Sequence, residues 1–403
     1  MKLHYNLLHG LFDCLNNTLN SKYYAHKSIE LIFKKNKKWG SRDRSFVAEA
    51  TYDIIRYLRL YDKLSNSNYS YTEKNIWKII SLWIYFNIES KTNYEKLWVF
   101  NKEEINKAKN LLEKKRVYRE SIPDWIDELA IEEIGEKKWE KEISSMNNKA
   151  DLVLRVNTLK TTKKNLIKKL YNQNIHCEDI PDRPNALKVK KRVNIFKTIE
   201  FKLGFFELQD ASSQLVAEFL DVNTNHKILD ACAGAGGKAL HIASILNNKG
   251  NIIATDIHEF KLKELKKRAR RNGIHNITTK IIDNKFIKKN KEKFDRVLID
   301  APCSGFGVIR RNPDSKWKLN QKDFNRILKN QIKILTNYSK LVSDNGIMVY
   351  VTCSIFPSEN EKQIALFLNN EFGKKFKIIE EKKISPHDSG YDGFYLAKLK
   401  KKC

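Results

Sequence analysis

The chain has 403 residues, of which 41% are hydrophobic and 11% aromatic, so it is long enough for two or three domains and too apolar to be disordered. Lys and Arg total 76 against 48 Asp and Glu, which gives a net charge of +28. Such an excess is typical of proteins that bind a polyanion such as nucleic acid, although the abundance of Lys, Asn and Ile indicates that an AT-rich coding sequence contributes to it.

The cysteines and the apolar segments exclude several classes of protein. Six cysteines are too few for a disulfide scaffold and indicate a reducing compartment. They form no C-x-x-C pair, so we expect no metal site. The first five residues do not resemble a secretory signal, and the stretch from Trp77 to Ile88 is too short and too polar to span a membrane. We therefore expect a cytoplasmic monomer with no membrane partner. The cysteines are Cys14, Cys177, Cys232, Cys303, Cys353 and Cys403.

Residues 1–145 are predicted to form a helical domain. They contain few glycines and no convincing strand, and their apolar residues recur at steps of three and four. The stretch from Trp77 to Ile88 is predicted to be a buried helix, and residues 66–71 are predicted to be a loop between helices. The periodic positions include Val47, Ala50, Ile54, Ile55 and Leu58, and then Trp77, Ile80, Ile84 and Ile88.

After this helical part, the pattern of apolar residues changes from helical periodicity to strands that alternate with helices. Residues 146–203 are predicted to form a small α/β module, with strands near 152–156 and 186–189 and a helix near 161–171. From residue 204 to 403, short apolar strands alternate with amphipathic helices, which predicts an α/β fold with a mostly parallel, doubly wound sheet. The expected strands are 227–230, 251–255, 277–282, 294–299 and 347–351, with helices near 260–271 and 324–342.

A glycine-rich turn between the first of these strands and its helix predicts a ligand-binding loop. Glycines let the backbone approach a ligand closely, and the start of a helix supplies free N–H groups. A structural turn would also explain the glycines, but Asp256 and Asp283 at the ends of the next two strands favour a nucleoside cofactor. The pattern does not separate NAD from S-adenosylmethionine, although G-x-G-G departs from the dinucleotide fingerprint. The cofactor candidates are Cys232, Ala233, Gly234, Ala235, Gly236, Gly237, Lys238, Asp256, Asp283 and Asp300.

Two further strands each lead into a cysteine. Cys303 follows the strand that ends at Asp300, and Cys353 follows the next strand of the sheet. If these strands are neighbours, their ends lie about 5 Å apart and both thiols face one cleft. Buried structural cysteines are the alternative interpretation for each thiol taken singly, and a redox disulfide is not expected in a reducing cytosol.

Paired thiols beside a carboxylate suit one demanding reaction, the methylation of cytosine at C5. A thiolate that adds to C6 makes C5 nucleophilic, an acid at the pyrimidine edge stabilises the ring charge, and a base then removes the C5 proton. Cys353, Asp300 and Cys303 are available for these roles.

A series of short motifs occurs in the second half of the chain. They are Phe206 to Ser213, Asp230-Ala231-Cys232-Ala233, Gly236-Gly237-Lys238, Asp300-Ala301-Pro302-Cys303-Ser304-Gly305, Arg311-x-Pro313-Asp314, Thr352-Cys353-Ser354 and Pro357-x-Glu359-Asn360-Glu361. Together they resemble the RsmB/Sun and Nop/Sun RNA cytosine-5 methyltransferases.

The resemblance implies a class I (Rossmann-like) methyltransferase domain with a seven-stranded, mostly parallel sheet, and S-adenosylmethionine as cofactor. It also implies that Cys353 is the nucleophile and that Cys303 assists release. Two positions depart from the family pattern, since Ala235 replaces the usual proline and Ala239 the usual threonine. These departures concern the rigidity of the turn and the affinity for the cofactor, because neither removes a catalytic group.

A weaker resemblance concerns the N-terminal part and the RNA partner. The pattern from Asp43 to Arg56 is similar to the NusB-like domain of the RsmB/Sun subgroup, which implies 16S rRNA as the RNA substrate, with tRNA as the alternative. An RNA-binding ribosome-assembly factor whose catalysis is dispensable is the other reading of the basic, helical sequence, whereas a dehydrogenase would leave the twin thiols unexplained. Candidate RNA contacts are Arg155, Asn157, the basic run 261–271, Arg310 and Arg311.

Overall fold

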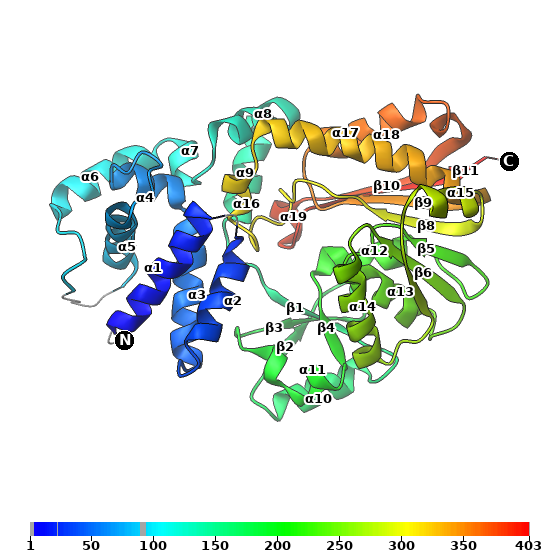
Figure 1. Cartoon of the computed structure of the whole chain (residues 1–403), viewed down its shortest axis with the longest axis horizontal. Coiled ribbons are helices and arrows are strands. Elements are labelled where there is room, and N and C mark those ends of the chain that lie inside the picture. The colour runs from blue at the N-terminus through cyan, green and yellow to red at the C-terminus, as the bar shows by residue number, and fades with distance from the viewer. Residues whose placement is uncertain (1–3, 22, 89–93, 403) are drawn as a thin grey trace. The chain divides into compact units, whose positions relative to one another are not determined.

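The computed structural model describes residues 4–21, 23–88 and 94–402 (Figure 1). Cys403 and the residues before His4, which entered the sequence argument, lie outside the described residues. The chain forms two compact units, one of Met1–Asn147 with Ile309–Asn320 and one of Asn148–Val308 with Gln321–Cys403. Within the described ranges, no helix is long and apolar enough to cross a membrane.

The first unit is helical, as the apolar periodicity predicts. Its core joins the inward faces of α1, α3 and α5, with Leu11, Ile54 and Ile80 fully buried. The predicted buried stretch at 77–88 falls on α5, and the predicted loop at 66–71 precedes it. The helices are α1 Tyr5–Asn20, α2 Ala25–Lys35, α3 Ser41–Arg56, α4 Leu58–Leu64, α5 Glu73–Asn87, α6 Lys102–Glu113, α7 Arg116–Arg119, α8 Asp124–Ile134, α9 Glu136–Met146 and α16 Ser315–Lys318.

A segment from later in the chain, 309–320, belongs to this helical unit. The Nζ of buried Lys316 donates to the Arg56 carbonyl at 2.8 Å, so it caps the end of α3. Asp314 accepts the backbone N–H of Ala25 at 2.7 Å, at the start of α2. Asp314 of the Arg-x-Pro-Asp motif and Lys316, two residues after it, therefore fasten this segment to the helices by hydrogen bonds to their ends.

Arg310 of the same segment does not have the role that the sequence suggested. Its side chain is buried and donates to the backbone carbonyl and hydroxyl of Ser145. The prediction that Arg310 is presented to RNA is therefore wrong, because its guanidinium is used inside the helical unit.

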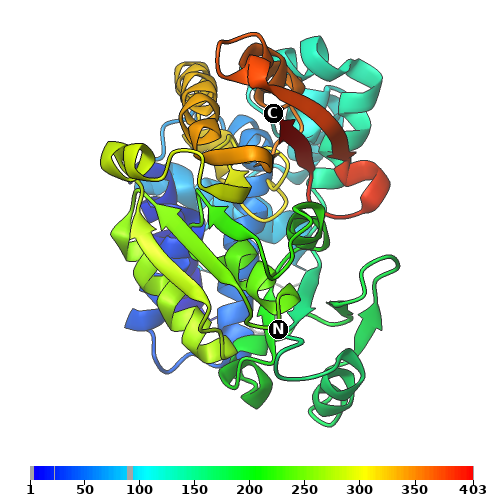
Figure 2. The ribbon, with the colours of Figure 1, turned by 90° about the vertical axis from the view of Figure 1, so that its right-hand side faces the viewer.

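The second unit begins with the small module, a four-stranded antiparallel sheet in the order β2-β3-β1-β4. The predicted alternation at 152–156 becomes β1, whose Leu154 and Val156 are buried against α10. Figure 2 shows this module from a second direction. Its elements are β1 Leu152–Val156, α10 Lys163–Tyr171, β2 Cys177–Asp179, β3 Ala186–Val189, η1 Ile195–Lys197, α11 Ile199–Lys202 and β4 Phe206–Leu208.

A seven-stranded sheet in the order β10-β11-β9-β8-β5-β6-β7 forms the rest of the second unit. Neighbouring strands from β9 to β7 are parallel, and β11 is antiparallel to both of its neighbours. This confirms the predicted α/β class and the mostly parallel sheet. The strands are β5 Lys227–Asp230, β6 Asn251–Asp256, β7 Ile277–Ile281, β8 Phe294–Asp300, β9 Val342–Thr352, β10 Phe376–Ile384 and β11 Phe394–Lys401.

Helices cover both faces of this sheet (Figure 1). Apolar residues of α12, α13 and α14 pack on one face in a cluster that includes Leu240 and Leu265. Residues of α15, α17 and α18 pack on the other face, around Leu335 and Phe367. The helices are α12 Ala211–Phe219, α13 Gly237–Ile245, α14 Glu259–Asn272, α15 Asn284–Lys289, α17 Gln321–Tyr338, α18 Glu361–Leu368 and α19 Pro386–Ser389, with η2 Ser339–Leu341, η3 Pro357–Glu359 and η4 Gly373–Lys375.

The small module packs directly on the C-terminal end of α14. Asn157 Nδ2 donates to the carbonyls of Gly204 at 2.7 Å and Asn272 at 2.9 Å, and Lys160 Nζ donates to the Arg271 carbonyl at 2.7 Å. Cations and donors at this position satisfy the free carbonyls of a helix end. Asn157 is buried in this contact, so the structure contradicts the expectation that it holds RNA.

Gly204→Ala is expected to destabilise the second unit. Gly204 has a φ of +73°, and a Cβ there would lie 2.1 Å from the Arg271 carbonyl oxygen. Gly390 has the same φ of +73° but nothing within 4 Å of its Cβ position, so Gly390→Ala reports the backbone cost alone. We expect Gly204→Ala to lower the free energy of unfolding by about 1–3 kcal/mol more than Gly390→Ala in urea titrations. Equal losses for the two variants would show that the contact between Gly204 and α14 is unimportant.

Candidate active site

The glycine-rich loop between β5 and α13 is held against the end of β6. The N–H of Ala233 donates to the Thr255 carbonyl at 2.8 Å, and the N–H of Gly234 donates to Asp256 Oδ2 at 3.1 Å. Gly236 has a φ of +89°, and a Cβ there would lie 2.5 Å from Leu265 Cγ. Only glycine fits that position, since the backbone is left-handed and α14 is in contact.

Two of the three predicted acidic cofactor ligands, Asp256 and Asp283, occupy different settings. Asp256 is buried at the end of β6, and its Oδ1 also accepts the N–H of His258 at 2.8 Å. Asp283 is exposed and lies just beyond β7, where its Oδ1 accepts the N–H of Phe286 at 2.7 Å and caps α15. The structure thus gives Asp256 a role in holding the loop and Asp283 a role as a helix cap, and their contacts with a cofactor stay predictions.

Asp230, the last residue of β5, is a site residue that the sequence marked only as part of a motif. It is fully buried, and its carboxylate lies beside the backbone N–H of Cys232 at the start of the loop. Burial, reinforced by the neighbouring Asp300, raises the pKa of Asp230 from 3.8 to about 7. A fully buried carboxyl next to the glycine-rich loop is costly to ionise.

Asp230→Asn is expected to change how stability depends on pH. Because the folded-state pKa is raised, the folded chain holds this proton more tightly, and the free energy of unfolding falls as pH rises from about 4 to about 7. A shift of this size corresponds to at most about 4 kcal/mol. Urea unfolding of the ligand-free protein at pH 5 and pH 8 should show a smaller loss for the variant than for the wild type. Parallel losses in the two proteins would contradict a perturbed Asp230.

The structure brings the two predicted thiols together. Strands β8 and β9 pair in parallel, with Asp300 opposite Val351, so both cysteine loops leave the same end of the sheet. Cys303 Sγ lies 3.3 Å from Cys353 Sγ. The hydrogen bond with Cys353, together with burial, raises the pKa of the Cys303 thiol well above its usual value of 9.0. Cys303 therefore holds a proton that it shares with Cys353.

Lys238 and Asp300 form an ion pair next to the thiols. Lys238 Nζ lies 2.5 Å from Asp300 Oδ2, and the ammonium lies 5.6 Å from the centre of the Phe394 ring. Burial opposes the charge on Lys238, but the adjacent Asp300, with Cys353 contributing, outweighs it and raises the pKa of Lys238. The sequence grouped Lys238 with the cofactor loop. The structure pairs it with Asp300 and places its charge close enough to interact electrostatically with Cys353.

A buried carboxylate, Glu359, links the two cysteine loops. Its Oε1 accepts the N–H of Ser304 at 2.8 Å, and its Oε2 accepts the Ser304 hydroxyl at 2.5 Å. The Ser354 side chain also hydrogen-bonds to Glu359, whose pKa burial raises. Ser304 follows Cys303 and Ser354 follows Cys353, so one carboxylate fixes the residue after each thiol.

Neighbours of Glu359 hold the residues that precede the thiols. Gln331 Nε2, buried on α17, donates to both the Pro302 carbonyl and Glu359 Oε1 at 3.1 Å. Thr352 donates to Asn360 Oδ1 at 2.5 Å. The sequence marked Glu359 and Asn360 only as part of a motif and missed Gln331, because a polar residue inside an amphipathic helix gives no signal that it is buried.

Known protein families and curated relatives match large parts of this chain. The family model described as 16S rRNA methyltransferase RsmB/F matches residues 217–400, and that of the RsmF/B-like ferredoxin-like domain matches residues 122–196. A Synechocystis protein named probable ribosomal RNA small subunit methyltransferase B is 32% identical over 316 residues, which cover 73% of this chain and 70% of that relative. The chain belongs to the RsmB/F methyltransferase family.

Other relatives of the RsmB/F family extend the comparison. A Bacillus subtilis protein, also named probable ribosomal RNA small subunit methyltransferase B, is 36% identical over 266 residues, which cover 62% of this chain. The match spans 59% of that relative, which is less than two thirds of its length. The solved structure of the protein PH0851 superposes with a TM-score of 0.79 at 24% identity and covers 100% of both chains, which shows the fold.

Proposed function

We propose that this protein transfers a methyl group from S-adenosylmethionine to C5 of a cytosine in small-subunit (16S) rRNA, through a covalent bond between Cys353 and C6. The observation that carries this proposal is the 3.3 Å separation of the two thiols beside the Lys238–Asp300 pair. Membership of the RsmB/F family supports it.

Cys353 acts as the nucleophile and Cys303 as the base in this scheme. The Cys353 thiolate adds to C6, and the electron pair displaced from the C5–C6 double bond makes C5 nucleophilic. After C5 has been methylated, the Cys303 thiolate removes the C5 proton, the double bond re-forms and the bond from C6 to Cys353 breaks.

The hydrogen bond between the thiols is consistent with Cys353 as the nucleophile and Cys303 as the base. The hydrogen bond and charge of Cys353 are two of the causes that raise the pKa of Cys303. Once Cys353 Sγ is bonded to carbon, it is neither an anion nor an equivalent acceptor. The pKa of Cys303 then falls, so Cys303 loses its proton to solvent and is present as the thiolate base only after the nucleophile has added.

Lys238 and Asp300 are placed to interact with the polar edge of the pyrimidine. Addition at C6 pushes negative charge onto the ring, and a fixed cation beside the thiols stabilises that charge. Asp300 holds the Lys238 ammonium in place, and its carboxylate can accept a hydrogen bond from the amino group of the cytosine. Both groups are partly exposed, so a flipped or unpaired base can reach them.

The residues at the loop fit S-adenosylmethionine. The Asp230 carboxyl lies at the start of the loop, and a Cβ at Gly234 or Gly237 would meet nothing within 4 Å, so the backbone there leaves room for a ligand. Asp230, Asp256 and residues 231–237 would hold the cofactor, which supplies the methyl group when bound. Asp283 is the further candidate at the adenine end.

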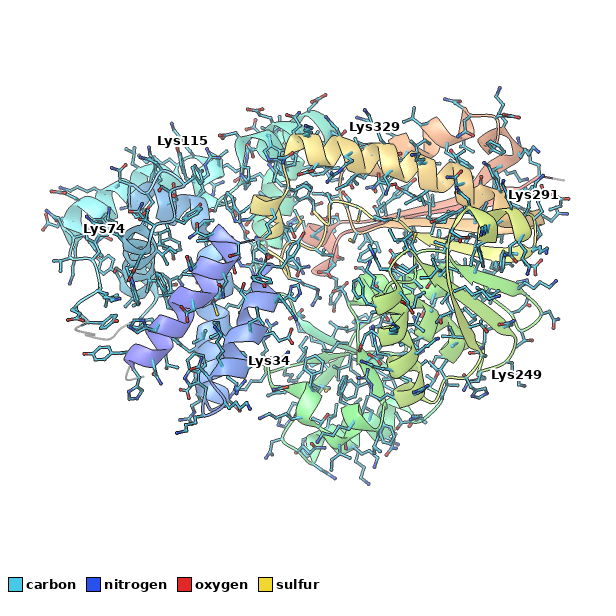
Figure 3. The ribbon with its side chains drawn as sticks, viewed as in Figure 1. Lys34, Lys74, Lys115, Lys249, Lys291 and Lys329 are labelled. Atoms are coloured by element: carbon cyan, nitrogen blue, oxygen red, sulfur yellow. The ribbon has the colours of Figure 1, made fainter. Side chains whose placement is uncertain are left out.

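Surface charge supports RNA as the substrate. Exposed lysines occur on both units, and six of them project outward in Figure 3. They neutralise phosphate without reading sequence, so target choice is left to other contacts. We assign RNA docking to the NusB-like helical unit, and the action of the protein to the cytoplasm. The six lysines are Lys34, Lys74, Lys115, Lys249, Lys291 and Lys329.

A labelling experiment tests this proposal. Purified protein is incubated with methyl-labelled S-adenosylmethionine and unmodified small-subunit rRNA, and the RNA is digested to nucleosides. We expect label in 5-methylcytidine at one position, and none with Cys353→Ala. Label only on tRNA would keep the chemistry and change the substrate. Tight RNA binding with no label on any RNA would instead support an assembly factor.

A further inference from the structure

A buried cluster of charged residues joins the small module to the cofactor loop. Arg155 of β1 is buried and its Nη1 donates to the Gly237 carbonyl at 2.7 Å. Arg268 of α14 donates from Nη1 to the Ala235 carbonyl at 2.9 Å and from Nη2 to Glu207 Oε2 at 3.0 Å. These contacts contradict the expectation that Arg155 holds RNA, because its guanidinium faces the loop.

Glu207 of β4 is the anion at the centre of this cluster. Its side chain is only 4% exposed, and Oε1 accepts from Arg271 and Asn272 while Oε2 accepts from Arg268. Burial opposes its charge, but Arg268, Arg271 and Asn272 outweigh burial and lower the pKa of Glu207. Arg268 and Arg271 of the basic run are therefore engaged internally, and Glu207 orients Arg268 toward the loop.

The cofactor loop is thus held from two sides. The end of β6 accepts the N–H groups of Ala233 and Gly234, while the cluster donates to the carbonyls of Ala235 and Gly237. A glycine-rich turn loses much conformational entropy when it is ordered. Ala235 restricts the turn less than a proline would, which increases the dependence of the turn on these contacts.

We propose that Arg155, Glu207 and Arg268 are positioning residues through which the small module orders the loop that binds S-adenosylmethionine. This inference rests on the proposed function. The three residues act through the backbone of the loop, which two of them contact directly at the carbonyls of Ala235 and Gly237. Their loss weakens binding of the cofactor without weakening binding of RNA.

The test compares Arg268→Met with Arg270→Met. Arg270 lies on the same helix and is exposed, so the control removes an equal charge from the same element. Calorimetric titration with S-adenosylmethionine should show a Kd about 10- to 100-fold higher for Arg268→Met and a Kd within about twofold of wild type for Arg270→Met. Arg268→Lys should fall between them, because one ammonium cannot bridge Ala235 and Glu207 as the guanidinium does.

Kinetics and folding measurements separate the alternatives. We expect the KM for S-adenosylmethionine to rise in Arg268→Met while the KM for RNA stays unchanged. If that variant does not fold, Glu207→Gln, which leaves the arginines in place, should weaken cofactor binding in the same direction. An unchanged Kd in folded variants, or a rise confined to the KM for RNA, would overturn the inference. A wild-type protein that does not bind S-adenosylmethionine would instead overturn the proposed function.

Discussion

Cys303→Ala is expected to accumulate an RNA–protein adduct that survives denaturation. In the proposed scheme Cys353 still adds to C6 and C5 is still methylated. The base whose Sγ lies 3.3 Å from Cys353 Sγ is missing, however, so the C5 proton is not removed. The bond from Cys353 to C6 then cannot break, and turnover stops after one cycle. Gel electrophoresis under denaturing conditions with labelled rRNA and S-adenosylmethionine measures the adduct, and turnover should fall by about 10³-fold or more.

The control variants separate release from addition. The double variant Cys303→Ala/Cys353→Ala should form no adduct, because the nucleophile is missing. Cys177→Ala changes a half-buried thiol of the small module, distant in sequence from both loops, and should turn over like the wild type. A Cys303→Ala protein that turns over normally and leaves no adduct would remove Cys303 from the release step.

Glu359→Gln is expected to lower kcat by about 100-fold while the protein stays folded. The carboxylate accepts two hydrogen bonds from Ser304 and is also bonded by Ser354 and Gln331. An amide directs an N–H₂ group at one of these donors, so the two cysteine loops must separate or rotate. Displacements of about 1 Å between reacting groups cost rates of this order. Single-turnover methylation assays measure the effect.

Glu361→Gln is the matched control for Glu359→Gln. It makes the same change two residues later, at a partly exposed carboxylate that pairs with Lys383. We expect its kcat to stay within about twofold of wild type. The two variants should bind S-adenosylmethionine equally well, since in the described part of the chain the carboxylates of Glu359 and Glu361 hydrogen-bond to residues other than 231–238. Equal kcat values for the two variants would show that Glu359 does not position the thiols.

The parallel part of the sheet follows from local patterns in the sequence. Strands β5, β6 and β8 are short apolar runs, each followed by a turn or by polar residues, and their predicted bounds lie within one residue of the observed ones. Strands β10 and β11 were expected only through the family resemblance. β10 is exposed along most of its length and rich in Lys and Glu, so its residues show no apolar alternation.

The candidate site shows the same division between local and long-range information. Cys303 and Cys353 could be paired from the sequence, because both follow strands whose neighbourhood the doubly wound topology dictates. The roles of Glu359 and Gln331 depend on side chains that meet from η3 and α17, and no spacing rule reports such a meeting. The sequence predicts that Arg155 contacts RNA because arginines usually lie on the surface. Its burial depends on the packing of the small module, which the sequence does not reveal.

In the proposed scheme, Cys353 forms the covalent bond to RNA and Cys303 brings about its release. Wild-type protein, with both thiols present, is incubated with S-adenosylmethionine and rRNA in which cytidine is replaced by 5-fluorocytidine. Fluorine at C5 cannot be removed as a proton, so the adduct persists, and mass spectrometry of the digested protein identifies the modified cysteine. We predict the nucleotide on Cys353. A nucleotide on Cys303, or no adduct under conditions in which natural rRNA is methylated, would contradict the account.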